Sequence, residues 1–124
     1  MMRGEHSGFE LMQKLYEEFK DTGMDFCQDF REYAYNGYIR MSPTAMALAR
    51  PCRDEEGDYW FIRAAVGPLP EVMAMLPGYL PRIAWCRNND GIIRMYKTDR
   101  LFRLAIKQLE KEREKHVSET LSAN

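Results

Sequence analysis

The sequence lacks the residue sets on which many enzymes and metal proteins of this size depend. Its three cysteines, Cys27, Cys52 and Cys86, are widely spaced, and no C-x-x-C pair occurs. The two histidines, His6 and His116, stand near the termini, so no interior histidine can serve a cysteine nucleophile or complete a zinc site. We therefore predict reduced thiols, no metal, no cofactor and no Cys-His catalytic machinery.

Long apolar runs are absent as well. Every apolar stretch is short and is broken by arginine or proline, so nothing in the sequence is long enough to span a bilayer. The first residues lead into a charged amphipathic segment and contain no apolar stretch of the signal-peptide kind. We expect no membrane partner and a cytoplasmic location.

The composition is that of a globular protein. The chain has 124 residues, of which 45% are hydrophobic and 30% charged, which predicts a single domain over residues 1–124, with residues 118–124 frayed. The net charge of −1 conceals an uneven distribution. Residues 82–124 hold ten Lys/Arg and six Asp/Glu, whereas residues 1–81 hold eight and thirteen. Such a distribution is typical of a basic surface for an acidic partner, or of helix charges that face water.

Two helices are expected at the start of the chain. Ser7 and Glu10 form an S-x-x-E capping box, and Gly23 can end the helix that follows. Asp25 is expected to cap a second, shorter helix, which ends at Asn36-Gly37. The apolar residues that recur at helical spacing in the first helix are Phe9, Met12, Leu15, Tyr16 and Phe19.

The middle of the chain predicts strands. Residues 38–41 form a short strand, and residues 59–66 are apolar and β-rich, as in a central strand. Residues 44–50 fit either a strand or a short helix, because Ser42-Pro43 resembles a helix start. We favour a hairpin that joins residues 44–50 to 59–66.

The last third predicts a short helix, a hairpin and a long helix. The short helix covers residues 71–76, with proline in its first turn. Residues 82–87 and 92–97 form a hairpin around the polar turn 88–91. Thr98 caps the final helix, whose apolar face consists of Leu101, Phe102, Leu104, Ala105, Ile106 and Leu109.

The fold class predicted from these elements is α+β. Their order is α-α-β-β-β-α-β-β-α. We expect a two-layer domain in which the helices pack on one face of a mainly antiparallel sheet.

One candidate ligand site lies where the central strand turns into the short helix. A strand followed by glycine and a helix start suits phosphate, which makes Arg63 and Gly67 candidate ligand-binding residues. The upstream strand order loosely resembles that of N-acyltransferases that bind acyl-CoA at such a turn, which implies an acyl-CoA- or nucleotide-binding enzyme. The sequence departs from that family in lacking its glycine-rich loop, and Pro68 and Pro70 each remove an amide donor.

A second candidate site is a nucleic-acid surface on the 82–103 hairpin and helix start. Arginines interleaved with aromatics can pair with phosphates and stack on bases. Strand alternation places the basic residues on both faces of the hairpin, and the pI of about 6.1 is low for such a domain. The candidate nucleic-acid-binding residues are Arg82, Arg87, Arg94, Lys97 and Arg100.

The third interpretation is a protein interface. Apolar residues crowd the region from Leu69 to Leu80, nine methionines are many for this length, and the charged helix beyond Leu109 could meet another chain. The same residues could instead close the core. We favour a small binding or adaptor protein that self-associates, as a homodimer for example. The alternatives are a nucleic-acid-associated regulator and an acyl-CoA- or nucleotide-binding enzyme.

Overall fold

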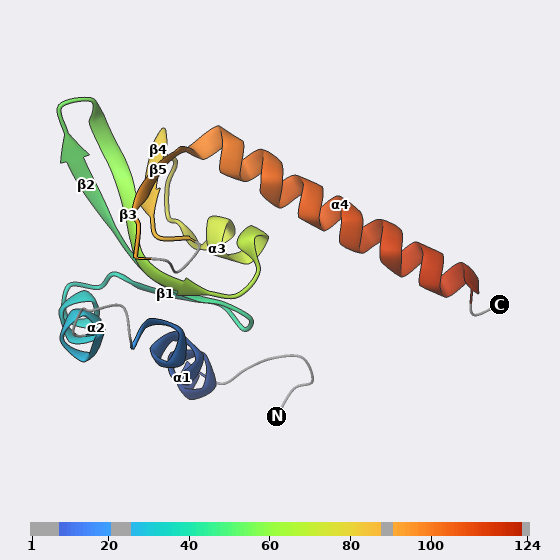
Figure 1. Cartoon of the computed structure of the whole chain (residues 1–124), viewed down its shortest axis with the longest axis horizontal. Helices are drawn as coiled ribbons and strands as arrows, with labels where there is room; N and C mark the ends of the chain where they lie inside the picture. The colour runs from blue at the N-terminus through green and yellow to red at the C-terminus, as the bar shows by residue number, and fades with distance from the viewer. Residues whose placement is uncertain (1–7, 21–25, 88–90, 123–124) are drawn as a thin grey trace.

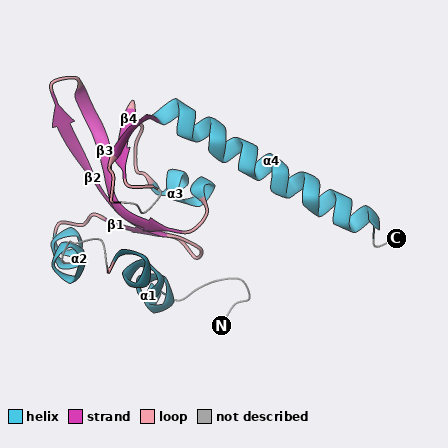
Figure 2. Ribbon diagram, viewed as in Figure 1, coloured by secondary structure: helices cyan, strands magenta, loops and turns pink. Residues whose placement is uncertain are grey.

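The structure, a computed structural model, describes residues 8–20, 26–87 and 91–122, with side chains as far as Lys115. Four helices and five strands follow one another in the predicted order (Figures 1 and 2). The elements are α1 (Gly8–Phe19), α2 (Phe26–Tyr35), β1 (Ile39–Met41), β2 (Met46–Asp54), β3 (Gly57–Val66), α3 (Leu69–Met75), β4 (Arg82–Trp85), β5 (Arg94–Lys97) and α4 (Thr98–Ser122).

The five strands form one sheet in the order β1-β2-β3-β4-β5. Neighbouring strands are antiparallel except β3 and β4, which are parallel and are connected through α3. The favoured hairpin at residues 44–50 is confirmed, because β2 pairs with β3 from Met46↔Val66 to Asp54↔Gly57. The hairpin of β4 and β5 is confirmed as well, although its turn at residues 88–90 lies outside the described residues.

A bulge in the β2–β3 ladder changes which face of the sheet the β3 side chains occupy. Leu48 pairs with Ala64 and Ala49 pairs with Ile62, so Arg63 has no counterpart on β2. Because one extra residue reverses the alternation, Ile62 and Ala64 belong to different core clusters despite their even spacing. The bulge therefore lets β3 contribute apolar side chains to both faces of the sheet.

The two core clusters correct the predicted arrangement of layers. One cluster joins the sheet to α3 and α4, with Trp60, Ile83 and Leu101 buried in it. The other joins it to α1 and α2, with Leu15 and Leu48 buried. The α+β class and the mainly antiparallel sheet are confirmed, but helices cover both faces rather than one (Figure 1). The physical reason is that β2 and β3 are apolar on both faces, and each face requires cover.

The described helix ends agree with the sequence expectations only in part. The helix expected at residues 71–76 is Leu69–Met75, and Thr98, expected as a cap, is the first residue of α4. After α2 the chain turns at Asn36 and Gly37, and Gly37 has a φ of 76°, a conformation that glycine adopts readily. The short helix α3 begins directly after Pro68. The final helix continues to Ser122, so residues 118–122, expected to fray, are helical. The expected caps Ser7 and Asp25 and the stop at residue 23 lie outside the described residues.

Candidate functional site

The start of α4 is anchored to the body of the fold. Leu101 is fully buried and Ala105 is 4% exposed, both in the cluster shared with α3 and the sheet. The backbone N–H of Thr98 donates to the Pro81 carbonyl at 3.0 Å, and the Thr98 hydroxyl donates to the Leu80 carbonyl. The rest of the helix extends away from the sheet and from α3 (Figure 1).

A second face of α4 carries a row of large apolar side chains that the fold leaves exposed. Phe102 is 38% exposed, and Ile106 and Leu109 are each 52% exposed. The spacings of four and three residues place them on one side of the helix, and Arg113 continues the row four residues later. Single exposed apolar residues are normal on a protein surface, but three in one row form a patch. We call Phe102, Ile106 and Leu109 the α4 stripe.

Helical spacing predicted a single apolar face for residues 101–109 of α4. The structure separates them, because Leu101 and Ala105 face the core while Ile106 belongs to the exposed stripe. Phe102, Ile106 and Leu109 follow the 4-3 spacing of a coiled-coil seam. Leu101 and Ala105 are also four residues apart, so spacing alone does not distinguish the exposed face from the buried one. The stripe is therefore the feature that sequence reasoning missed.

A row of cations runs along a different side of α4. Its members follow one another at spacings of three or four residues, so they share one side of the helix, and all are exposed. Like charges four residues apart destabilise an isolated helix slightly, although opposite charges at three residues, as at Lys107 and Glu110, offset part of that cost. The row consists of Arg100, Arg103, Lys107, Lys111 and Lys115.

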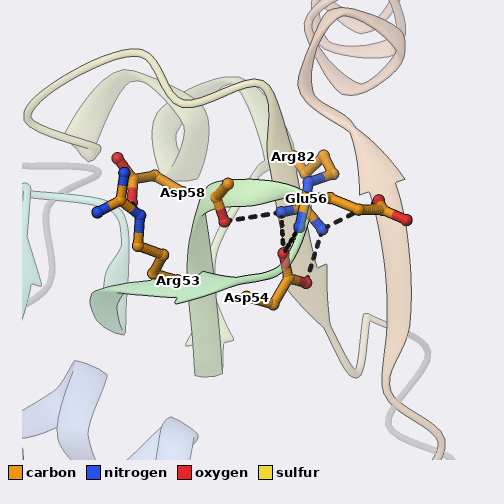
Figure 3. A network of polar contacts seen from close by, with 6 residues as sticks. Arg53, Asp54, Glu56, Asp58 and Arg82 are labelled. Atoms are coloured by element: carbon orange, nitrogen blue, oxygen red, sulfur yellow. Dashed lines mark hydrogen bonds and ion pairs between the residues drawn. The ribbon is translucent and has the colours of Figure 1, made fainter.

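Arg82, a candidate nucleic-acid contact, makes hydrogen bonds within the fold. Its guanidinium donates to the two carboxylate oxygens of Asp54 at 2.6 and 2.9 Å and to the Gly57 carbonyl at 2.9 Å (Figure 3). A carboxylate oxygen of Glu56 lies 3.6 Å away, and the guanidinium lies over the Tyr59 ring. The hydrogen bonds from Arg82 hold the pKa of Asp54 below its ordinary value. Arg82 therefore fastens the tip of the β2–β3 hairpin to β4.

The other predicted nucleic-acid residues do not form one surface. Arg94 and Lys97 lie at opposite ends of β5, where Arg94 is half-buried and Lys97 is exposed. Arg87 is half-buried just after β4, and Arg100 is exposed in the first turn of α4. Of the five, Arg82 and Lys97 are cross-strand partners in the β4–β5 ladder, and Arg100 follows Lys97 three residues later in the first turn of α4.

Arg63, a candidate ligand residue, is almost completely buried and has a partner from another layer. Its Nε donates to Asp29 Oδ2 on α2 at 2.7 Å, and the Arg63 side chain is only 7% exposed. Nη2 of Arg63 is buried without a hydrogen-bond partner among the described residues. The guanidinium thus holds α2 on the sheet through Asp29, and the Arg63 side chain also lines the depression between α2 and the β2–β3 pair described below.

Gly67, the other candidate in the phosphate turn, is needed for packing. Its φ is 114°, and a Cβ built on it would lie 2.5 Å from the Ala45 Cβ and 2.7 Å from the Thr44 carbonyl oxygen. The turn before β2 thus occupies the space next to Gly67. The helix that follows has seven residues, and Pro68 and Pro70 supply no amide donors.

The apolar region that the sequence offered as an interface mostly closes the core. Leu69, Val72 and Met73 of α3 are buried against the sheet. Tyr79 is the exposed exception, at 61%, and its hydroxyl donates to Asp99 Oδ1 at 3.0 Å, which raises the pKa of Tyr79. The charged helix beyond Leu109, the other part of the interface prediction, is exposed as far as Lys115.

Two of the depressions in the described surface have α2 residues in their walls. The larger, about 1250 Å³, is an open groove between α1 and α2 that reaches Val66 and has Tyr16 and Phe30 in its wall. The smaller, about 500 Å³, lies between α2 and the β2–β3 pair. There the Arg50 Nε donates to the Tyr33 hydroxyl at 3.2 Å. Burial raises the pKa of Tyr33.

The described residues contain neither a metal-binding cluster nor a membrane-spanning helix. No three or more His, Cys, Asp or Glu side chains gather there in a way that could hold a metal ion. No helix within the same residues is both long and apolar enough to cross a bilayer. Comparison of the chain with protein-family models, with curated proteins and with solved structures finds no match in any of the three.

Proposed function

We propose that this chain is a small binding or adaptor protein of the cytoplasm that works as a self-associated assembly, with the α4 stripe as the contact between copies. The observation that carries the proposal is the state of α4. Its first turns are anchored, but the remaining helix extends from the fold with Phe102, Ile106 and Leu109 exposed in one row.

Helix energetics supports this proposal. Isolated helices of a few turns are marginal in water, and most helical stability in proteins comes from packing an apolar face. Beyond Ala105, α4 runs for several turns away from the fold that anchors it. A second copy of the same stripe would supply that packing and would remove the exposed apolar side chains from water.

The experiment compares the native chain with two variants that each add one negative charge to α4. Ile106→Glu places the charge in the stripe, and Gln108→Glu places it on the exposed helix surface outside the stripe. Glutamate is a good helix former, so both variants should keep α4 intact. Light scattering after size exclusion should show dimers for the native chain and Gln108→Glu, and monomers for Ile106→Glu. A native chain that is monomeric throughout a wide concentration range contradicts the proposal.

A second candidate function is nucleic-acid binding, and the cation row of α4 favours it. Five exposed cations along one side of a helix could follow a phosphate backbone, and they continue from Lys97. It stands second because Glu110 and Glu114 lie beside the row and Arg82 has its partners within the fold.

A salt titration with single-stranded nucleic acid tests this second function. Binding should weaken steeply as salt rises, and Lys111→Gln should reduce the slope of log K against log salt by about one. Lys111 lies opposite the α4 stripe, so this variant should leave self-association unchanged. Absence of binding at low salt would eliminate the second function without affecting the first.

A further inference from the structure

We propose that two copies of this chain pair antiparallel, α4 against α4, with Arg103 of each copy beside Glu110 of the other. This inference rests on the proposed self-association and names the orientation of the partner, a second copy. It is carried by the positions of the charged residues around the exposed α4 stripe.

The stripe has the spacing of a coiled-coil seam. Phe102, Ile106, Leu109 and Arg113 are separated by four, three and four residues, which corresponds to alternating d and a positions of a heptad. The seam lies on one side of α4, is short, and includes one charged residue, Arg113. That charge decides the orientation of the partner.

A parallel, in-register pair would place Arg113 against Arg113 of the partner subunit inside the seam. Like charges at that place repel, and their burial is costly. In the antiparallel pair, Ile106 meets Leu109 of the partner subunit in two central layers. Arg113 then meets Phe102 of the partner subunit at each end, where a guanidinium on an aromatic ring is favourable.

The residues beside the seam agree with the antiparallel arrangement. Arg103 and Glu110 both follow a d position, so both are e positions, and in an antiparallel pair e positions of the two helices face each other. By symmetry the pair forms twice, Arg103 with Glu110 of the partner subunit and the reverse. In a parallel pair, these two positions would stand two helical turns apart, about 10 Å along the axis.

The test uses charge reversal and mixing of full-length variants. Arg103→Glu creates two Glu–Glu contacts in its own homodimer, and Glu110→Arg creates two Arg–Arg contacts. Each variant alone should dimerise about fivefold more weakly than the native chain, since exposed charge pairs contribute little individually. When the two are mixed, every contact becomes attractive, so a heterodimer should form with nearly native affinity.

The matched control reverses charges away from the seam. Lys111→Glu and Glu114→Arg change charge by the same amounts, and mixing them should give no preference for the heterodimer. Circular dichroism of each variant checks that α4 remains helical. If the native chain dimerises through Ile106 but the Arg103 and Glu110 variants show no preference for each other, the antiparallel arrangement is wrong and the self-association stands. If the native chain is monomeric, both are wrong.

Discussion

Arg63 and Asp29 lie 34 positions apart in the chain and meet in an ion pair of 2.7 Å that ties the middle of β3 to α2. The pair exists because the bulge opposite Leu48 and Ala49 adds one residue to β3 at position 63. Because a buried charge is tolerated only when it is paired, this contact fixes the α2 layer on the sheet.

Removal of the Asp29 carboxylate should destabilise the fold. Asp29→Ala leaves the Arg63 guanidinium buried and unpaired, and we expect a loss of about 3 kcal/mol in the free energy of unfolding, measured in urea. Glu32→Ala, an exposed carboxylate one turn along α2, is the control and should cost less than about 0.5 kcal/mol. Arg63→Met added to Asp29→Ala should recover part of the loss. Equal costs for the two single variants would show that the ion pair does not stabilise the fold.

Substitution of Gly67 should destabilise the fold because of its close packing and its backbone conformation. Gly67→Ala introduces a Cβ within 2.8 Å of three atoms of Thr44 and Ala45, at a φ that disfavours side chains. We expect a loss of about 2–4 kcal/mol, seen as a lower midpoint in thermal unfolding. Gly78→Ala, where a Cβ would meet nothing within 4 Å, should change the midpoint little. A Gly67→Ala variant as stable as Gly78→Ala would refute this account of the turn.

Acid should weaken the attachment of the hairpin tip to β4. Arg82 lowers the pKa of Asp54 in the folded state, so this carboxylate stabilises the fold above its unfolded pKa. That stability is lost as the pH falls through the lower, folded pKa. Unfolding free energies measured from pH 6 to pH 2 should therefore fall less steeply in Asp54→Asn than in the native chain. The same acid dependence in both proteins would contradict the assignment. Glu55→Gln, in the same turn, is the control.

Local patterns in the sequence predicted most of the fold. Residues close together in the chain are enough to predict several elements. Examples are the helical spacing of α1, the turn residues after α2 and the β-rich segment at 59–66. The order of elements and the β2–β3 hairpin follow from them. What local patterns cannot contain is the bulge at Arg63, because the extra residue is defined only by register against β2.

The contacts that the sequence does not predict are likewise between residues far apart in the chain. The partner of Arg63 is on α2 and the partner of Arg82 is on the β2–β3 turn, and nothing along the chain relates either pair. The two faces of α4 differ because the sheet and α3 cover only its first turns, which cannot be read from helical periodicity alone. Residue type and spacing therefore do not reveal that Arg63 and Arg82 have partners within the fold.

Sedimentation equilibrium of the full chain over a broad concentration range tests the central claim most directly. A short seam of four layers predicts a dissociation constant in the micromolar range. The protein concentrations measured must therefore extend well above that value. The account predicts a mass that rises from that of one chain, 14.6 kDa, to twice that value, and an Ile106→Glu variant that stays at one chain throughout. A native chain that remains at 14.6 kDa at the highest concentration would contradict it.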